Sequence, residues 1–566
     1  MQKSAIPVRK LDRRLKSRLL YTALAALLVF DLLYAVITVS GPTNLSEEYA
    51  YAGLALNAIH GQVNLQQIDA SRLLQYLPVA AFYEAFGVGI YTSSAWNMIC
   101  FLGTVLVAFL IGREVYGPIT GLASALLASF FTPIVKVSST LDIVMSMTFF
   151  TSLVMLALLY GRNRGSKAWM FAVGVLVVAA QLTIPIALIA AAALALYLVL
   201  ELARKRIELK LVLYVLAGAA VAAAAVLVFS YSVSGNPTLI ATQNGAYYSN
   251  LTMTNTVYGI IGAPVAYANG SKNDLFGWYM PYYPGQMFEY SAMQAIVGGI
   301  SHGNITPRSI WQQLYSPAMI AGFYFYAALA AVIYLAIKWD RRLYYPLMWL
   351  AVGFLFLQFA PQGGTLSPFR YILIFRDVRY LAVLAVPTSV VIAIALARFA
   401  SGKGRGAKGR SMRRIRISLA IAAVAFLILT SIPANIEWHN YIYTEYYSLH
   451  VLAGIIQHTG GITTVYYPSV DWPDLGIYLH DSSMLNLQML DYIQNCTQFA
   501  AGSYVILPNI TKGYAPHWPY INDTSAYCPA MRLVAEPEVP PPYGTAGFNQ
   551  MYVALKNQQR LYYVAP

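Results

Sequence analysis

Long apolar runs are the feature that most constrains this chain. About eleven stretches of roughly 17 to 22 residues carry few or no charges, and short polar turns separate them. A bilayer core of about 30 Å needs about 20 apolar residues for each helical crossing, whereas a water-soluble domain rarely needs so many runs of this length. With 58% hydrophobic and 11% charged residues over 566 positions, the chain is expected to be a polytopic α-helical membrane protein.

The expected spans follow in order from a strongly basic N-terminus. A signal peptide would have a shorter apolar region and a small-residue cleavage site, so the first run is expected to be retained, with the N-terminus inside. Thr183-Ile-Pro185 divides the run 169–200, which is too long for one span, into two. About eleven spans result: 19–40, 93–111, 119–135, one that ends near 160, the two halves of 169–200, then 211–230, 318–337, 343–359, 380–398 and 417–433.

Cationic turns assign sides to the loops. The turns 161–167, 203–206 and 338–342 and the Gly-rich segment 402–416 are basic and are therefore placed inside. The loops 41–91, 231–316 and 361–379 and the tail then fall outside. Seven Asn-X-Ser/Thr sequons agree with this topology, since all of them lie on segments placed outside: Asn44, Asn250, Asn269, Asn304, Asn495, Asn509 and Asn522. The chain is expected to consist of a transmembrane domain, 1–434, and an extracytoplasmic domain, 435–566.

The tail has the alternation typical of a small α/β domain. Short strands are predicted at 463–468, 504–508, 531–535, 551–555 and 561–564, and a helix is predicted at 484–494. Three cysteines are too few for a disulfide scaffold or a cysteine-rich metal site. Cys496 and Cys528 could pair if the tail is outside the cytoplasm.

The net charge of +14 raises the question of a nucleic-acid partner. Most of this charge lies in the short loops placed inside, where it sets topology and faces anionic lipid. We therefore expect membrane lipid, and no nucleic acid, as a partner. The seven histidines have no metal-ligand spacing.

Acidic residues on the outer side are the first candidates for chemistry. Glu47 and Glu48 are adjacent on the first external loop, and Asp142 lies at the outer end of the fourth span. The structural alternative for the two glutamates is a solvated helix start that Ser46 caps, and the alternative for Asp142 is a helix cap. Asp31 is a lone carboxylate inside the first span, which is either functional or paired within the bundle.

Three arginines in one short outer loop are the second candidate feature. Arg370, Arg376 and Arg379 run against the rule that cations collect on the inside. A guanidinium can bind a phosphate bidentately, which would explain them, and contact with lipid headgroups is the alternative. Lys136 is a further candidate phosphate contact, although a lysine at this depth also has the character of a snorkelling interface residue.

Carboxylates and arginines together on an outer membrane face suit glycosyl transfer from a polyprenyl-phosphate sugar. The acceptor hydroxyl is a weak nucleophile, so a carboxylate has to take its proton or hold a divalent metal ion that orients the reactants. The leaving polyprenyl phosphate develops negative charge, which arginine or lysine can neutralise.

Several short motifs follow one another over residues 10–400, and their order and common side are informative. They are Glu47-Glu48-x-x-Tyr51-x-x-x-Ala55 closing at Gly61, Tyr76-Leu-Pro78, Gly112-Arg113-Glu-Val-Tyr-Gly117 within 103–125, Thr132-Pro133 followed by Ser138, Ser139 and Asp142, and Arg379-Tyr380 with Pro387 beyond. Together they resemble the motifs of the GT-C superfamily of membrane glycosyltransferases, in particular the branch that holds the protein O-mannosyltransferases and the aminoarabinose transferases that modify lipid A.

This resemblance implies roles for individual residues. Glu47 would be the base or the ligand of a divalent metal such as Mg or Mn, with Glu48 and Asp142 in support. Arg379 and Tyr380 would contact the donor phosphate. The remaining expected site residues are Arg376, Arg370 and Lys136 at the phosphate and Tyr51 and Tyr76 along the substrate.

The resemblance also implies the reaction class. Family members are inverting, so we expect direct transfer of a hexosyl or mannosyl group from a polyprenyl-phosphate donor to a protein, lipid or glycan acceptor. The reaction would take place on the extracytoplasmic face of the plasma membrane. The sequence departs from the family in having Glu47 where Asp is usual, and it lacks the Trp-Trp-Asp-Tyr-Gly signature of oligosaccharyltransferases.

Two other classes remain as alternatives. A multi-spanning transporter or flippase of lipid-linked or polar solutes would have charged residues at mid-membrane and internal repeats, of which Asp31 is the one hint. A non-catalytic scaffold of the same fold is the other alternative, because Glu47 replaces the usual Asp.

Overall fold

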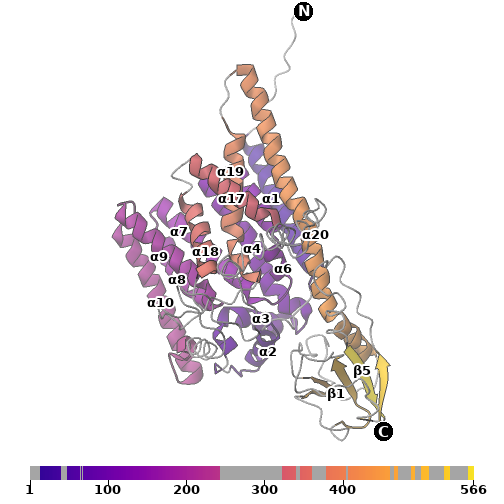
Figure 1. Cartoon of the computed structure of the whole chain (residues 1–566). Helices are drawn as coiled ribbons and strands as arrows, with labels where there is room; N and C mark the ends of the chain where they lie inside the picture. The colour runs from indigo at the N-terminus through magenta and orange to yellow at the C-terminus, as the bar shows by residue number, and fades with distance from the viewer. Residues whose placement is uncertain are drawn as a thin grey trace, which may run out of the picture.

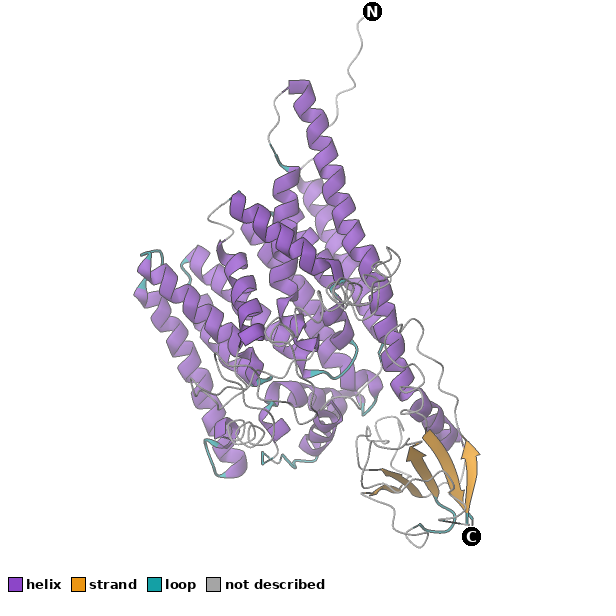
Figure 2. Ribbon diagram, in the orientation of Figure 1, coloured by secondary structure: helices purple, strands orange, loops and turns teal. Residues whose placement is uncertain are grey.

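The computed structural model is a bundle of helices with a small β-sheet at one end (Figures 1 and 2). The longest helix, α20, runs along one side of the bundle and ends beside the sheet. The structure describes residues 13–39, 48–63, 65–66, 68–242, 322–338, 344–359, 378–402, 406–458, 464–468, 486–490, 499–508, 528, 530–535 and 559–565.

Helices form because an apolar environment leaves the backbone polar groups no partners except one another. The α-helices are α1 (Arg13–Ile37), α2 (Glu48–Ile59), α3 (Leu73–Phe86), α4 (Ile90–Tyr116), α5 (Pro118–Ser129), α6 (Thr132–Ser138), α7 (Ile143–Arg164), α8 (Lys167–Gln181), α9 (Leu188–Ala203), α10 (Leu209–Ser234), α17 (Gly322–Ile337), α18 (Tyr344–Phe359), α19 (Ala385–Ala400) and α20 (Gly406–His458). The part of the chain that the structure describes also has three 3₁₀ helices: η1 (Ile68–Ser71), η2 (Pro185–Ala187) and η5 (Val378–Leu384).

Among the described residues, seven helices are long and apolar enough to cross a membrane. They are Arg18–Ile37, Ile90–Tyr116, Ile143–Arg164, Pro185–Ala203, Leu209–Ser234, Arg379–Ala400 and Ser411–Ile432, and each coincides with an expected span. Lys167–Gln181, Phe323–Ile337 and Tyr344–Leu357 are apolar but shorter. The protein is therefore a mostly helical, multi-spanning membrane protein, as the apolar runs predict.

The expected third span, 119–135, is not one straight helix. Helix α5 ends at Ser129 and α6 begins at Thr132, and the two form a pair bent by 63°. Phe131 has an extended backbone, and Pro133 stands in the first turn of α6. A proline has no backbone N–H, and its ring clashes with the carbonyl four residues earlier, which here belongs to Ser129 at the end of α5. The helix therefore stops at Ser129 and restarts in a new direction, with Pro133 in the first turn, where proline is tolerated. The segment 136–138, expected to be part of an outer turn, is the end of α6.

The predicted division of the run 169–200 is confirmed. Helix α8 ends at Gln181, and η2 begins at Pro185, after an extended Ile184. The backbone N–H of Leu74, at the start of α3, donates to the carbonyl of Leu182 at 3.3 Å. The turn between α8 and α9 therefore lies beside the first loop.

Two basic turns also lie together, at the other ends of these helices. Arg162 at the end of α7 and Arg206 after α9 approach the buried carboxylate of Glu201 at 3.1 Å and 3.7 Å. The turns 161–167 and 203–206, both predicted to be inside, thus share one side of the bundle.

The first external loop is more ordered than the sequence suggests. Helix α2, η1 and α3 fill most of 41–91, and α2 packs against α3. Of the loop 231–316, the part up to Ser234 continues α10, and 243–316 lies outside the described residues. Of the loop 361–379, the structure describes residues 378 and 379, in η5.

The tail forms a five-stranded sheet in the order β2-β1-β3-β5-β4. The strands are β1 (Thr464–Pro468), β2 (Asn486–Leu490), β3 (Tyr504–Pro508), β4 (Met531–Ala535) and β5 (Gln559–Val564). Strands β2, β1 and β3 are parallel, and β5 is antiparallel to β3 and β4. Four of the five predicted strands are present, and the fifth, 551–555, lies outside the described residues.

One expectation for the tail needs correction. The helix predicted at 484–494 is wrong over 486–490, because these residues form β2 and pair in parallel with β1. Their Leu, Gln and Met favour helix locally, and pairing in the sheet overrides that preference. Helix α20 runs past the expected domain boundary at 434/435 to His458, and the first strand, β1, begins at Thr464, where a strand was predicted.

Candidate active site

The candidate site begins at the N-terminus of α7, where Asp142 is the N-cap residue. Its Oδ1 accepts a hydrogen bond from the backbone N–H of Val144 at 2.9 Å. A short acidic side chain at this position satisfies an N–H that has no partner within the helix, and it faces the positive end of the helix dipole. Asp142 is 4% exposed, so its carboxylate is held inside the protein.

Arg379 pairs with the other oxygen of this carboxylate. Its Nη1 lies 3.4 Å from Asp142 Oδ2, and the two side chains are 13% and 6% exposed. The guanidinium also lies over the ring of Tyr380, 5.4 Å from its centroid, and Tyr380 is buried. Helix η5, which carries both residues, packs against α6 and α7. Residues more than 230 positions apart are thereby held as one ion pair.

Glu48 reaches the same segment from the first loop. It begins α2, is 3% exposed, and accepts a hydrogen bond through Oε2 from the backbone N–H of Leu141 at 3.3 Å. Leu141 directly precedes Asp142. The structure therefore brings together Glu48, Asp142 and Arg379, which the sequence analysis chose from three separate loops.

Tyr51 and Tyr76, expected along the substrate, lie in the packed interior of the first loop. Both are fully buried, and Tyr76 donates its hydroxyl to the carbonyl of Ala70 at 3.2 Å. Burial raises the pKa of the Tyr76 hydroxyl, so it stays a neutral donor. The hydroxyl of Tyr51 accepts from Arg72.

Arg72 is a buried cation that the sequence analysis missed. It is 3% exposed, forms an ion pair with Asp69 at 2.8 Å and lies over the ring of Tyr51. A single arginine in a polar loop has no sequence signal that separates it from a surface residue. Its burial becomes visible when α2 and α3 are packed together.

Of the remaining expected site residues, the structure describes Lys136. Lys136 lies on the last turn of α6 and is half-buried, one short segment before Asp142. Glu47, Arg370 and Arg376 lie outside the described residues. Within the part of the chain that the structure describes, no three His, Cys, Asp or Glu side chains come together as a metal site.

Asp31 is paired within the bundle. It is 2% exposed, and the hydroxyl of Ser129 on α5 donates to its Oδ1. This contact joins α1 to α5 and gives the intramembrane carboxylate a structural partner.

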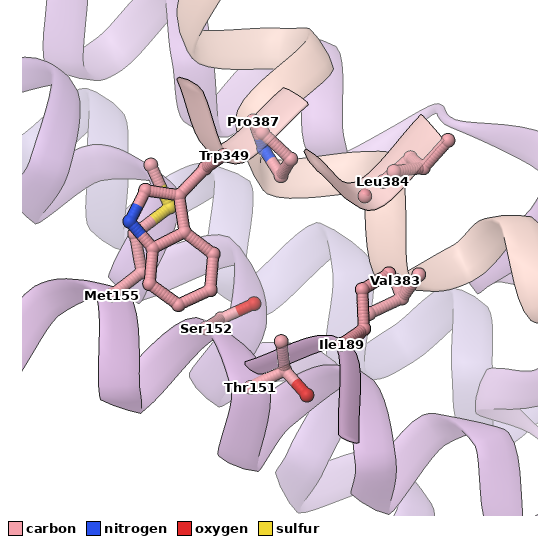
Figure 3. A pocket seen from close by; sticks show the side chains of 9 residues that line it. Thr151, Ser152, Met155, Ile189, Trp349, Val383, Leu384 and Pro387 are labelled. Atoms are coloured by element: carbon pink, nitrogen blue, oxygen red, sulfur yellow. The ribbon is translucent and has the colours of Figure 1, made fainter. Parts of the chain in front are cut away.

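A small cavity lies inside the bundle (Figure 3). It encloses about 10 Å³, which is room for about one water molecule. Its walls come from α7, α9, α18, η5 and α19, and they are Thr151, Ser152, Met155, Ile189, Trp349, Gly353, Val383, Leu384 and Pro387. Because Thr151 is nine residues into α7 from Asp142, or about 13 Å along the axis, the cavity is separate from the candidate site.

The fold is similar to that of proteins with solved structures. Comparison with solved structures finds the crystal structure of ArnT from Cupriavidus metallidurans bound to undecaprenyl phosphate, with a TM-score of 0.51 and 12% identity over 96% of this chain and 97% of that one. The apo form of the same protein gives a TM-score of 0.50 at 12% identity, over 95% and 97%. The Archaeoglobus fulgidus oligosaccharyltransferase with a tethered acceptor peptide gives 0.48 at 13% identity, over 86% and 69%.

No protein-family model matches the sequence, and no curated protein matches it. The likeness to ArnT, an aminoarabinose transferase, extends over nearly the full length of both chains. The chain therefore has the GT-C fold, as the order of its motifs predicts.

Proposed function

We propose that this protein is a membrane glycosyltransferase that moves a sugar from a polyprenyl-phosphate donor to an acceptor outside the cytoplasm. The observation that carries the proposal is the meeting of Glu48, Asp142 and Arg379 at one end of the bundle helices. A carboxylate can remove the proton of the acceptor hydroxyl, and an arginine can neutralise the charge that develops on the leaving phosphate. The resemblance in fold to a protein bound to undecaprenyl phosphate supports a polyprenyl donor.

The proposed roles follow from the contacts that the charged side chains already make. Asp142 uses one oxygen to cap α7 and the other to face Arg379, so it orients that guanidinium. A guanidinium carries five N–H donors, so an ion pair with Asp142 is compatible with a phosphate contact, with Arg376, Arg370 and Lys136 as further cations. Glu47 is the proposed base or the ligand of a Mg or Mn ion, and an assay with and without EDTA distinguishes these two roles.

The proposed topology has eleven spans, with the N-terminus inside and the tail outside. Seven long helices, the bent pair of α5 and α6, and the shorter α8, α17 and α18 make up this number. Cys528 is disulfide-bonded, which suits an oxidising compartment, and the proposed partner Cys496 lies outside the described residues. The expected setting is the plasma membrane, with inverting transfer of a hexosyl or mannosyl group to a protein, lipid or glycan.

The test is transfer of labelled sugar from purified polyprenyl-phosphate donors by the full chain in lipid nanodiscs. Glu47→Gln should lower transfer by at least about 100-fold, as expected for loss of a general base. Arg379→Gln should lower it by roughly 10- to 100-fold through loss of a charged hydrogen bond.

Arg164→Gln is the matched control. Arg164 stacks on Tyr160 at the opposite end of α7, 4.2 Å from the ring centroid, and its loss should leave transfer unchanged. Transfer by Glu47→Gln at the wild-type rate would remove Glu47 from the mechanism. A wild-type protein that moves whole lipid-linked sugars across the bilayer, without transferring sugar, would establish the transporter alternative.

A further inference from the structure

Two buried amide side chains, Gln75 on α3 and Asn97 on α4, lie directly beneath the segment that carries Asp142. Both are 0% exposed. Burying an amide without hydrogen bonds costs several kcal/mol, so an apolar side chain would serve simple helix packing better. The burial of these two amides is explained by the backbone carbonyl groups that they bind.

Residues 137–142 comprise the last two residues of α6 and the turn that leads to α7, where backbone groups lack partners within a helix. Asn97 Nδ2 donates to the carbonyls of Asp142 at 2.6 Å and Thr140 at 2.8 Å, and it lies 3.4 Å from that of Val137. These three carbonyl oxygens fix the orientation of the Asn97 amide. If the amide were flipped, its own oxygen would face them and be repelled.

Gln75 completes the same set of contacts. Its Nε2 donates to the carbonyl of Leu141 at 2.8 Å and faces Asn97 Oδ1 at 3.5 Å, while its Oε1 accepts from the hydroxyl of Ser146. The peptide groups of Leu141 are thus held from two sides, the carbonyl by Gln75 and the N–H by Glu48. Four elements, α2, α3, α4 and α7, meet on this segment.

We propose that Gln75 and Asn97 are positioning residues of the active site, which hold residues 137–142 so that Asp142 meets Arg379 and Leu141 meets Glu48. The inference rests on the proposed function for its catalytic part. Neither amide touches the ion pair directly, and both act through the backbone. Loss of either frees the segment to move and lets the Asp142 carboxylate turn away from Arg379, so turnover falls more than donor binding.

The test uses Gln75→Met and Asn97→Leu, which keep side-chain size and remove the donors. Thr104→Val is the matched control, because Thr104 is equally buried on α4 and its hydroxyl bonds to Cys100 of its own helix at 2.7 Å. Hydrogen exchange of the amides 141–144 in the intact protein should speed up about 10-fold or more in both variants, as expected when a buried hydrogen bond is lost. The control should exchange like the wild type.

Sugar transfer then tests the catalytic part. In both variants kcat should fall by about 10-fold or more, with the KM for the donor within about twofold. Faster exchange with unchanged kcat would overturn the positioning role, and unchanged exchange would overturn the contact network itself. If the wild type transfers no sugar, the proposed function fails, and the exchange result still decides whether the two amides hold the segment.

Discussion

At the scale of single residues, the contacts of Asp142 suit it to orienting Arg379 and not to taking a proton from the acceptor. One carboxylate oxygen caps α7 and the other faces Arg379. A group acting as a base needs a lone pair directed at the substrate hydroxyl, and the pairing of Asp142 with Arg379 competes with that use. Asp142 is therefore better suited to fixing the arginine, which leaves Glu47 as the proposed base.

Asp142→Asn tests this division of roles. An asparagine still caps the helix, whereas the ion pair with Arg379 is lost. We expect thermal stability close to that of the wild type and transfer lowered by about 10- to 100-fold, which corresponds to the roughly 1.5 to 3 kcal/mol of a hydrogen bond to a charged group. Asp142→Ala removes the cap as well and should cost about 1 kcal/mol more in stability. Wild-type transfer by a folded Asp142→Asn protein would contradict the role.

The sequence revealed the charged members of the site and missed the neutral ones, for a physical reason. Arg379 stands out because a cation on an outer loop runs against the distribution that membrane insertion favours. Asp142 stands out as an acid at the predicted outer end of a span. Asn97 lies in an apolar run and Gln75 in a polar loop, and neither position is unusual for its residue type. Their role depends on carbonyl groups 40 to 66 residues away in the chain, which the fold alone brings to them.

At the scale of elements, two glycines, Gly174 on α8 and Gly218 on α10, allow these helices to pack closely. A Cβ on Gly218 would fall on the carbonyl oxygen of Phe171, and one on Gly174 would fall on that of Val215. Most of α10 is otherwise exposed, with Val215, Gly218 and Ser230 as its buried residues. Close backbone contact through small residues is a common way for helices to associate in lipid, where no hydrophobic force drives them together.

Gly218→Ala should therefore loosen α10 from the bundle. The added methyl meets backbone and cannot be relieved by a side-chain rotation, so we expect a loss of about 1 to 3 kcal/mol, as for other overpacked sites. Thermal unfolding in detergent, followed by size-exclusion chromatography, measures it. Gly454→Ala, on α20, is the control: open space surrounds Gly454, and alanine favours helix there. Equal melting temperatures for the two variants would show that the close contact contributes nothing.

The ends of helices could be predicted where a proline interrupts the backbone. They could be predicted less well where the pairing of strands determines the structure. Pro185 marked the start of η2, since a proline favours an extended residue before it. Pro133 explains the break between α5 and α6 that the span 119–135 overlooked, because proline cannot donate to the carbonyl of Ser129, four residues earlier. Strand β2 was missed because its pairing with β1 outweighs the helical preference of its residues. The drop in hydropathy near 435 suggested a domain boundary, yet α20 keeps its helix to His458 after leaving the apolar region.

At the scale of the whole molecule, α20 sets how far the sheet stands from the bundle. It has 53 residues and is therefore about 80 Å long, whereas its apolar part, Ser411–Ile432, needs about 30 Å of bilayer. The 26 residues from there to His458 reach about 40 Å beyond the membrane core. Figure 1 shows α2, α3 and the sheet at the same end of the molecule. The sheet thus lies at the end of the molecule that carries the candidate site.

This shared side is tested by labelling single cysteines with a membrane-impermeant maleimide in intact cells. The background is Cys100→Ala, which removes the buried free thiol; it should take up no label without reductant, because Cys528 is disulfide-bonded. Into it are placed Ala85→Cys on α3, Ala500→Cys in the tail and Lys210→Cys at the start of α10, all at exposed positions. We expect the first two to be labelled in intact cells and the third after permeabilisation, since α10 begins beside the basic turn 203–206. Labelling of Ala500→Cys and Ala85→Cys from opposite sides would separate the sheet from the active site, and labelling of all three from outside would overturn the topology.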